Sequence, residues 1–138
     1  GTFNQGFMTT ELLAAALLDM ELHNLTDTEN LNVVAFEKET MDKLGLIPEI
    51  APRYRATYFS HIIGGYAAGY YSYLWAEVLD TDAFEAFKEH GVFDKNTADS
   101  FRKNILEKGG TEDPMTLYRG FRGADPSLEP LLKNRGLK

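Results

Sequence analysis

The sequence contains no cysteine, no long apolar run and no excess of basic residues. Without cysteine, disulfides, thiolate catalysis and cysteine-ligated metal sites are excluded. No apolar stretch approaches the about 20 residues that a membrane-spanning helix needs, and the first residues do not resemble a signal peptide. A net charge of −7 argues against nucleic acid, because phosphate binding requires a basic face. We expect a cytoplasmic or periplasmic protein, with the cytoplasm favoured, that binds neither membranes nor nucleic acid.

The length of 138 residues suits a single domain, and 43% hydrophobic with 25% charged residues is ordinary for a globular protein. The chain starts without an initiator methionine, so we expect it to be a piece of a longer polypeptide. Basic residues gather near its end, where we predict a solvated or carboxylate-paired face. These residues are Arg119, Arg122, Lys133, Arg135 and Lys138.

Helix signals recur along the chain, and no segment alternates as a strand would. The predicted helices run from Thr9 to about Leu25, from about Asn30 to Lys43, from about Ala67 to His90 and from Thr97 to Lys108, with shorter ones starting near Glu112 and Ser127. A threonine cap is predicted for the first helix, Gly91 for the end of the third and an Asp94 cap for the fourth. The apolar residues predicted to face a core are Leu13, Leu17 and Met20 with their neighbours Leu12, Ala16 and Leu18, then Val33, Val34, Phe36, Met41 and Leu44, then Leu74, Val78, Phe84 and Phe87. The predicted fold class is all-α, an irregular helical bundle with a glycine- and tyrosine-rich loop.

Six of the seven tyrosines lie between Tyr54 and Tyr73, around a glycine-rich stretch that contains a histidine. A core seldom concentrates phenols in this way, because each buried hydroxyl needs a hydrogen-bond partner. Tyr66, Tyr70 and Tyr73 would share one face if they were helical, as an aromatic packing stripe. The neighbouring glycines instead favour a mobile loop. Phenols are protonated at neutral pH, so such a loop could donate hydrogen bonds to a developing oxyanion.

The three histidines are too far apart in sequence to form the H-E-x-x-H zinc helix. We interpret His23 and His90 as helix-end residues, since a cation suits a helix C-terminus. His61 lies between an aromatic run and Gly64-Gly65, and there functional and structural roles remain equally open.

Several stretches resemble the C-terminal part of the thimet oligopeptidase and peptidyl-dipeptidase family of zinc metallopeptidases. They are QGFMTTELLAAALLDMELH, PRYRATYF, FSHIIGGYAAGYYSYLWAEVL, GGTEDP and EPLLKNRGL, and together they span nearly the whole chain. The resemblance implies that residues 1–138 are a single all-helical C-terminal portion of the catalytic domain of a larger zincin-like helical peptidase. The alanine-rich loop and the PRYR segment are more similar to the bacterial peptidyl-dipeptidase branch.

The resemblance also implies roles for individual residues. His61, Tyr66 and Tyr73 would be catalytic, with the tyrosines contacting the scissile carbonyl or the substrate backbone. The residues that would bind substrate are His61, Tyr66 and Tyr70, the hinge glycines Gly64 and Gly65, and Arg53 and Arg55 as candidates for pairing with a free C-terminal carboxylate.

Zinc is the cofactor that the resemblance implies for the parent enzyme, but its H-E-x-x-H helix is absent from this chain, so no metal ligand is assigned here. Glu11 and Glu21 cannot replace a histidine pair. The implied partners are oligopeptides with a free C-terminus and the rest of the parent polypeptide, and the isolated chain is expected to be inactive and prone to oligomerise.

Two other interpretations stay open. One is a non-enzymatic helical module that binds a peptide or protein. The other is a self-contained metal enzyme built from His23, His61 and an acid such as Glu21.

Overall fold

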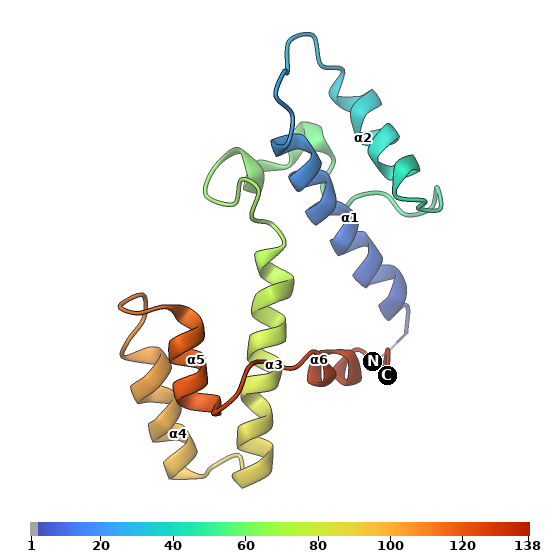
Figure 1. The fold of residues 1–138 in the computed structure, drawn as a ribbon. Coiled ribbons are helices and arrows are strands. Elements are labelled where there is room, and N and C mark those ends of the chain that lie inside the picture. The colour runs from blue at the N-terminus through green and yellow to red at the C-terminus, as the bar shows by residue number, and fades with distance from the viewer. Residues whose placement is uncertain (1–2) are drawn as a thin grey trace. The chain divides into compact units, whose positions relative to one another are not determined.

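A computed structural model describes residues 3–138, and none of these residues lies in a β-strand, which confirms the all-α prediction. The elements in chain order are α1 (Gln5–His23), α2 (Val33–Lys43), η1 (Ala56–Tyr58), η2 (Ser60–Ile63), α3 (Ser72–His90), α4 (Lys95–Phe101), η3 (Arg102–Leu106), α5 (Pro114–Arg122) and α6 (Glu129–Asn134) (Figure 1). The chain forms two compact units, the first ending at Leu74 and the second spanning Trp75–Lys138. That the segment is one portion of a single catalytic domain stays a prediction.

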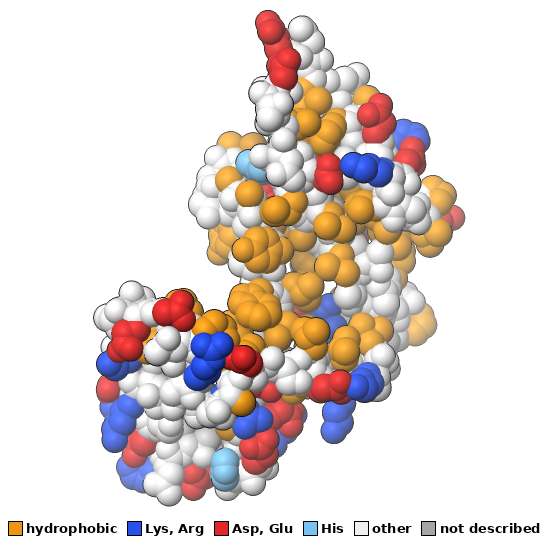
Figure 2. Space-filling model, in the orientation of Figure 1, with side chains coloured by type: hydrophobic (Ala, Val, Ile, Leu, Met, Phe, Trp, Pro, Cys, Tyr) orange, Lys and Arg blue, Asp and Glu red, His pale blue; other side chains and the backbone are white. Residues whose placement is uncertain are grey.

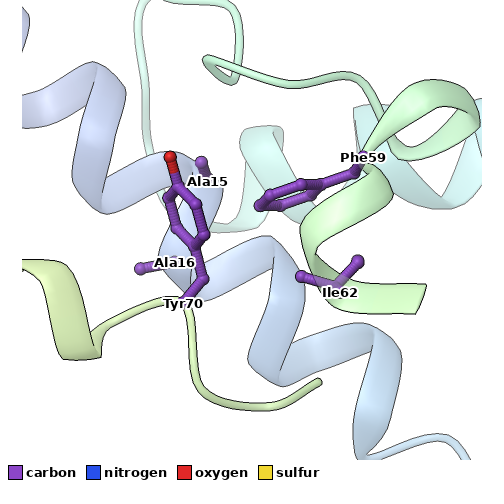
Figure 3. Packing of buried hydrophobic residues seen from close by; sticks show 5 residues of the cluster. All are labelled: Ala15, Ala16, Phe59, Ile62 and Tyr70. Carbon is purple, nitrogen blue, oxygen red and sulfur yellow. The ribbon is translucent and has the colours of Figure 1, made fainter. Parts of the chain in front are cut away.

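In the first unit, α1 packs against both α2 and the segment that holds the tyrosines. Ala15 and Ala16 of α1 contact Phe59, Ile62 and Tyr70 in one buried cluster (Figure 3). Alanines leave room for aromatic rings to approach the helix backbone closely. A second cluster joins the other side of α1 to α2 through Ala14, Leu18 and Met41.

The predicted buried face of α1 is confirmed at Ala16 and Leu18 but is wrong at its three central residues. Leu13, Leu17 and Met20 are 38–42% exposed, and the buried face consists of the alanines together with Leu18 and Asp19. Periodicity indicated a wide apolar face but could not indicate which part of it the tyrosine segment covers. The predicted threonine cap is also wrong, because α1 begins at Gln5 and the Thr10 hydroxyl donates to the Gly6 carbonyl instead, at 2.8 Å.

Helix α2 starts close to the predicted residue and buries part of the predicted face, with Phe36 packed against the cluster that contains Met41. Asn32 caps it, accepting a hydrogen bond from the backbone N–H of Ala35 at 3.0 Å. Met41 is buried as predicted, whereas Val34 and Leu44 are exposed. The polar residues Glu37 and Thr40 take inward positions instead.

Helix α3 begins at Ser72 rather than at about Ala67, so the long predicted helix is too long at its start. Residues 64–71 form turns, and Ala68 has a φ of 52° in the left-handed region. Tyr66 and Tyr70 therefore do not lie on one helical face with Tyr73. The glycines of this stretch weaken helix formation, and backbone N–H groups that a helix would use are bound by a side chain of α1, as described below.

The second unit is built on aspartate caps and aromatic packing. Asp94 and Asp113 cap α4 and α5 by accepting hydrogen bonds from backbone N–H groups, at 2.7 Å and 3.0 Å. Phe87, Phe101 and Phe121 pack edge to face or tilted, with ring centroids 5.2–6.2 Å apart. Phe84 is 46% exposed, which corrects its predicted place in the core.

A buried polar contact joins α5 to α3 in this unit. The Tyr118 hydroxyl donates to the Asp82 carboxylate at 2.5 Å, and both side chains are buried. Burial and this hydrogen bond raise the pKa of Tyr118 above its usual value. The Arg122 Nε atom lies 3.4 Å from the same carboxylate, so the buried charge has a cationic neighbour.

Four of the five basic residues near the C-terminus pair with carboxylates and the fifth, Lys133, is exposed, in agreement with the predicted solvated or carboxylate-paired face. The pairs are Arg119 with Asp125, Arg122 with Glu89, Arg135 with Glu77 and Lys138 with Glu129. These cations are therefore neutralised locally.

Candidate functional site

The candidate site lies in the first unit, where the structure gathers aromatic rings around His61. The ring centroid of His61 is 4.8 Å from that of Tyr54, 5.4 Å from Tyr70, 6.0 Å from Tyr66 and 6.1 Å from Tyr73. The rings come from the stretch before η1, from the glycine-rich loop and from the start of α3. The predicted site histidine and its predicted tyrosines are thus brought together although they are not on one helix.

Tyr66 and Tyr73 form a stacked pair, with ring centroids 5.0 Å apart and planes 18° from parallel. Both side chains are about two-fifths exposed, at 42% and 41%. A side-chain hydrogen bond to Tyr66, reinforced by desolvation, raises the pKa of Tyr73 to about 12. The Tyr73 hydroxyl therefore stays protonated over the physiological pH range, and the pair offers accessible hydroxyl groups next to an imidazole.

Tyr70 differs from its neighbours because its side chain is only 3% exposed. Its ring packs edge-on against Phe59, with centroids 4.8 Å apart, inside the cluster drawn in Figure 3. Burial raises its pKa, while the charge of Arg53 acts in the opposite direction. Tyr70 supports the loop from beneath, and a contact between Tyr70 and substrate stays a prediction.

His61 has a free ring nitrogen. Its Nδ1 atom is buried and has no hydrogen-bond partner among residues 3–138. Buried polar atoms of proteins are usually hydrogen-bonded, so an unpartnered one marks a place where a ligand or another part of a polypeptide can contribute a contact.

The predicted hinge glycines are exposed, and a Cβ atom added at Gly64 or Gly65 would meet no atom within 4 Å. Neither has a φ in the left-handed region. Neither the space around these positions nor their φ therefore requires glycine, and their hinge role stays a prediction.

The two candidate arginines have different surroundings. Arg55 donates from Nε to the carboxylate of Glu37, which is buried, and so forms an ion pair within the unit. Arg53 is exposed and makes no ion pair with any residue in the described part of the chain. Its guanidinium is available for a carboxylate from outside.

Two buried carboxylates hold the ends of the tyrosine segment, and neither was predicted from the sequence. Glu37 of α2 accepts from the backbone N–H of Ala56 at 2.8 Å, in addition to its pairing with Arg55. Asp19 of α1 accepts from the backbone N–H groups of Ala68 and Tyr70, each at 2.9 Å. The available signal was an acid within the apolar run LLAAALLDM, because a charge on a buried helix face needs a partner.

The remaining histidines lie at helix ends, as predicted. His23 ends α1, and its Nδ1 atom lies 2.9 Å from the Asp19 carboxylate. His90 ends α3, with Nδ1 at 2.9 Å from the Ala86 carbonyl oxygen.

In the described part of the chain, no group of three histidine, cysteine, aspartate or glutamate side chains could hold a metal ion. The zinc that the resemblance implies therefore fits no set of residues in this part of the chain, and a metal centre built from His23, His61 and Glu21 is not formed. Between residues 3 and 138, no helix is long and apolar enough to cross a membrane.

Comparison with known proteins places this helical segment in a class of peptidases. The sequence profile of peptidase family M3 matches residues 1–137, so the chain belongs to peptidase family M3. It is 44% identical to dipeptidyl carboxypeptidase of Salmonella typhimurium over 138 residues, which is 98% of this chain and 20% of that protein. Dipeptidyl carboxypeptidase of Escherichia coli is 45% identical over 142 residues, again 98% of this chain and 20% of that protein.

Oligopeptidase A of Haemophilus influenzae is 40% identical over 137 residues, with 98% of this chain and 20% of that protein covered. The chain thus spans about a fifth of the length of the curated relatives it matches. Relatives of both kinds match, so assignment to the dipeptidase branch stays a prediction.

Proposed function

We propose that this chain is the C-terminal segment of a zinc-dependent peptidyl-dipeptidase or oligopeptidase, and that its tyrosine and histidine loop binds substrate and stabilises the oxyanion during peptide hydrolysis. Membership of family M3 supports the reaction class. The observation that carries the assignment is the stacked and exposed Tyr66–Tyr73 pair beside His61.

The tyrosine pair suits oxyanion stabilisation for a chemical reason. Attack on a peptide carbonyl places negative charge on its oxygen, and hydrogen bonds that strengthen as this charge develops accelerate the reaction. The raised pKa of Tyr73 keeps its hydroxyl protonated, so that it can donate. Tyr66 is its direct neighbour, and the ring of His61 lies beside both tyrosines.

We propose oligopeptides with a free C-terminus as substrates and Arg53 as the residue that pairs with their terminal carboxylate. A guanidinium group binds a carboxylate through parallel hydrogen bonds. Arg53 is favoured over Arg55, because Glu37 already neutralises Arg55. Substitution Arg53→Ala should then raise KM for peptides with a free C-terminus more than for C-terminally amidated ones.

We propose that the zinc ion and its ligands belong to parts of the parent polypeptide outside these 138 residues. A bound zinc ion supplies the activated water of a metallopeptidase. The proposed work of this segment is to bind and orient the peptide and to donate hydrogen bonds. The compartment, cytoplasmic or periplasmic, also stays a prediction.

The test uses Tyr73→Phe and Tyr66→Phe in the longer polypeptide that carries this segment. Loss of one oxyanion donor should lower kcat by about 100- to 1,000-fold, with a much smaller change in KM. Tyr71→Phe is the matched control, since Tyr71 lies in the same loop and is exposed. A wild-type kcat in both variants would exclude oxyanion stabilisation by the tyrosine pair. Peptide hydrolysis by the isolated chain would contradict the proposal that the zinc ion and its ligands lie outside these 138 residues.

A non-enzymatic interaction module remains the second candidate, because large apolar side chains of α1 are exposed. They are Phe7, Met8, Leu13, Leu17 and Met20. Figure 2 shows hydrophobic side chains over much of the visible face of the first unit. Saturable binding of an apolar peptide by the chain alone, lost on Leu17→Asp but retained on Tyr73→Phe, would favour this candidate.

A further inference from the structure

We propose that Asp19 is a positioning residue, whose buried carboxylate holds the glycine-rich loop so that Tyr66 stays stacked on Tyr73. This inference rests on the proposed function of the tyrosine pair. Asp19 itself faces the loop backbone and not the exposed hydroxyl groups.

The contacts of Asp19 are specific to the loop. One carboxylate oxygen accepts from the backbone N–H of Ala68 and the other from that of Tyr70, both at 2.9 Å. The His23 Nδ1 atom lies 2.9 Å from the first of these oxygens. Both oxygens are thus engaged, and two of the three contacts reach residues that lie between Tyr66 and Tyr73 in the chain.

Because Asp19 is buried, losing these hydrogen bonds would be energetically unfavourable. Its side chain is 0% exposed, and no lysine or arginine in the described part of the chain forms an ion pair with it. A buried carboxylate without partners is strongly unfavourable, so the loop amides and His23 stabilise the charge. The carboxylate in turn restricts the loop, because any loop conformation that moves these amides away leaves the buried carboxylate without hydrogen-bond donors.

The held loop has a conformation that its sequence does not favour. Ala68 has a φ of 52°, a left-handed value that residues other than glycine adopt at a cost. The adjacent turns are closed by hydrogen bonds from the Gly69 N–H to the Tyr66 carbonyl and from the Ala67 N–H to the Gly64 carbonyl, at 2.9 Å and 3.1 Å. Tyr66 is therefore connected to the Asp19 contacts through a short, bonded stretch of backbone.

If Asp19 positions the loop, its substitution should change the Tyr66–Tyr73 contact and leave the helix folded. Asp19→Asn has nearly the same shape, but its amide NH₂ group cannot accept from a backbone N–H. One loop contact should then be lost while the helix stays folded. The released loop would let Tyr66 move away from Tyr73, and the hydrogen bond between the two phenols would weaken.

The test begins with Asp19→Asn in the 138-residue chain, with Asp80→Asn as the control because Asp80 is an exposed aspartate of α3. Ultraviolet titration of the tyrosines should show the pKa of Tyr73 falling from about 12 toward its ordinary value in Asp19→Asn and staying near 12 in Asp80→Asn. A folded Asp19→Asn chain with an unchanged Tyr73 titration would overturn the proposal.

Kinetics of the longer polypeptide provide a second readout. Asp19→Asn should lower kcat by about 10- to 100-fold, as expected for losing one charge-assisted hydrogen bond that orients the loop, and should change KM by less than about threefold. An unchanged kcat in Asp19→Asn, where Tyr73→Phe lowers it, would overturn the positioning role alone. If Tyr73→Phe also leaves kcat unchanged, the proposed function fails, and the titration still decides whether Asp19 positions the loop.

Amide hydrogen exchange in the unmodified chain keeps the proposal testable if Asp19→Asn does not fold. The N–H groups of Ala68 and Tyr70 should exchange about tenfold or more slowly than that of Gly65, for which no hydrogen-bond acceptor is found in the described residues. Exchange of Ala68 and Tyr70 as fast as that of Gly65 would overturn the proposal.

Discussion

Substitution of Tyr118 by phenylalanine removes a single hydroxyl group from the interior of the second unit. That hydroxyl donates to the Asp82 carboxylate at 2.5 Å, and the two side chains are only 6% and 4% exposed. The ring itself would keep its packing in the variant. The experiment therefore removes a short hydrogen bond to a buried charged acceptor together with a longer one, of 3.4 Å, to the Leu79 carbonyl oxygen.

The expected cost follows from the surroundings of the carboxylate. A hydrogen bond to a charged group contributes about 1.5–3 kcal/mol to stability, and its loss leaves one oxygen of a buried carboxylate without that donor. Arg122 remains 3.4 Å away and compensates part of the charge. We therefore expect Tyr118→Phe to lower the free energy of unfolding by about 2 kcal/mol.

Urea unfolding followed by circular dichroism measures this change. With an m value of about 2 kcal/mol per molar urea, the midpoint should fall by about 1 M. Tyr71→Phe is the control, because the Tyr71 side chain is exposed and should change stability by less than about 0.5 kcal/mol. A double-mutant cycle with Asp82→Asn should give a coupling energy of at least about 1 kcal/mol. Equal midpoints for Tyr118→Phe and Tyr71→Phe would refute the reasoning.

Three further predictions concern a cap, a turn and the tyrosine pair. Asp94→Ala removes the cap of α4 and should cost about 1 kcal/mol in urea unfolding at neutral pH. Because backbone hydrogen bonding lowers the pKa of Asp94, the stabilisation is lost as the pH falls through that lowered pKa. The free energies of unfolding of variant and wild type should therefore converge in acid, and a difference that stays constant with pH would contradict this. Gly109→Ala should cost about 1 kcal/mol because Gly109 has a φ of 54°, whereas Gly110→Ala, without a left-handed φ, should cost little; equal effects would exclude a conformational cause. Tyr66→Phe should lower the pKa of Tyr73 from about 12 toward 10 in ultraviolet titration, since the hydrogen bond to Tyr66 favours the protonated phenol, and an unchanged curve would mean that the bond is absent.

Helix ends could be predicted from the sequence where a residue type has a strong preference for that position. Asp94 caps α4, Gly91 follows the end of α3 at a φ of 111°, and His90 lies in the last turn, all as expected. Such signals are local, because the residue and the backbone group that it satisfies are neighbours in the chain.

Buried faces were predicted less well, since burial depends on partners from distant parts of the chain. Leu17 and Asp19 are both on α1, and hydrophobicity alone places Leu17 inside and Asp19 outside. The structure reverses them, because the amides of the loop compensate the carboxylate. The candidate site could be predicted as a group of residue types, but the resemblance could not show that Tyr70 is buried while Tyr66 and Tyr73 are exposed.

The attachment of the loop has a consequence for how freely its sequence can vary. Asp19 and Glu37 bind the segment through backbone N–H groups at positions 56, 68 and 70. Every residue except proline supplies such a group, so the hydrogen bonds themselves do not depend on the side chain, although the left-handed φ of position 68 disfavours β-branched residues there. A library that varies position 68 among residues that tolerate a left-handed φ, and keeps Asp19, can thus change the surface offered to a peptide without releasing the loop. A substitution of Asp19 would instead remove a hydrogen-bond acceptor of the loop in every variant.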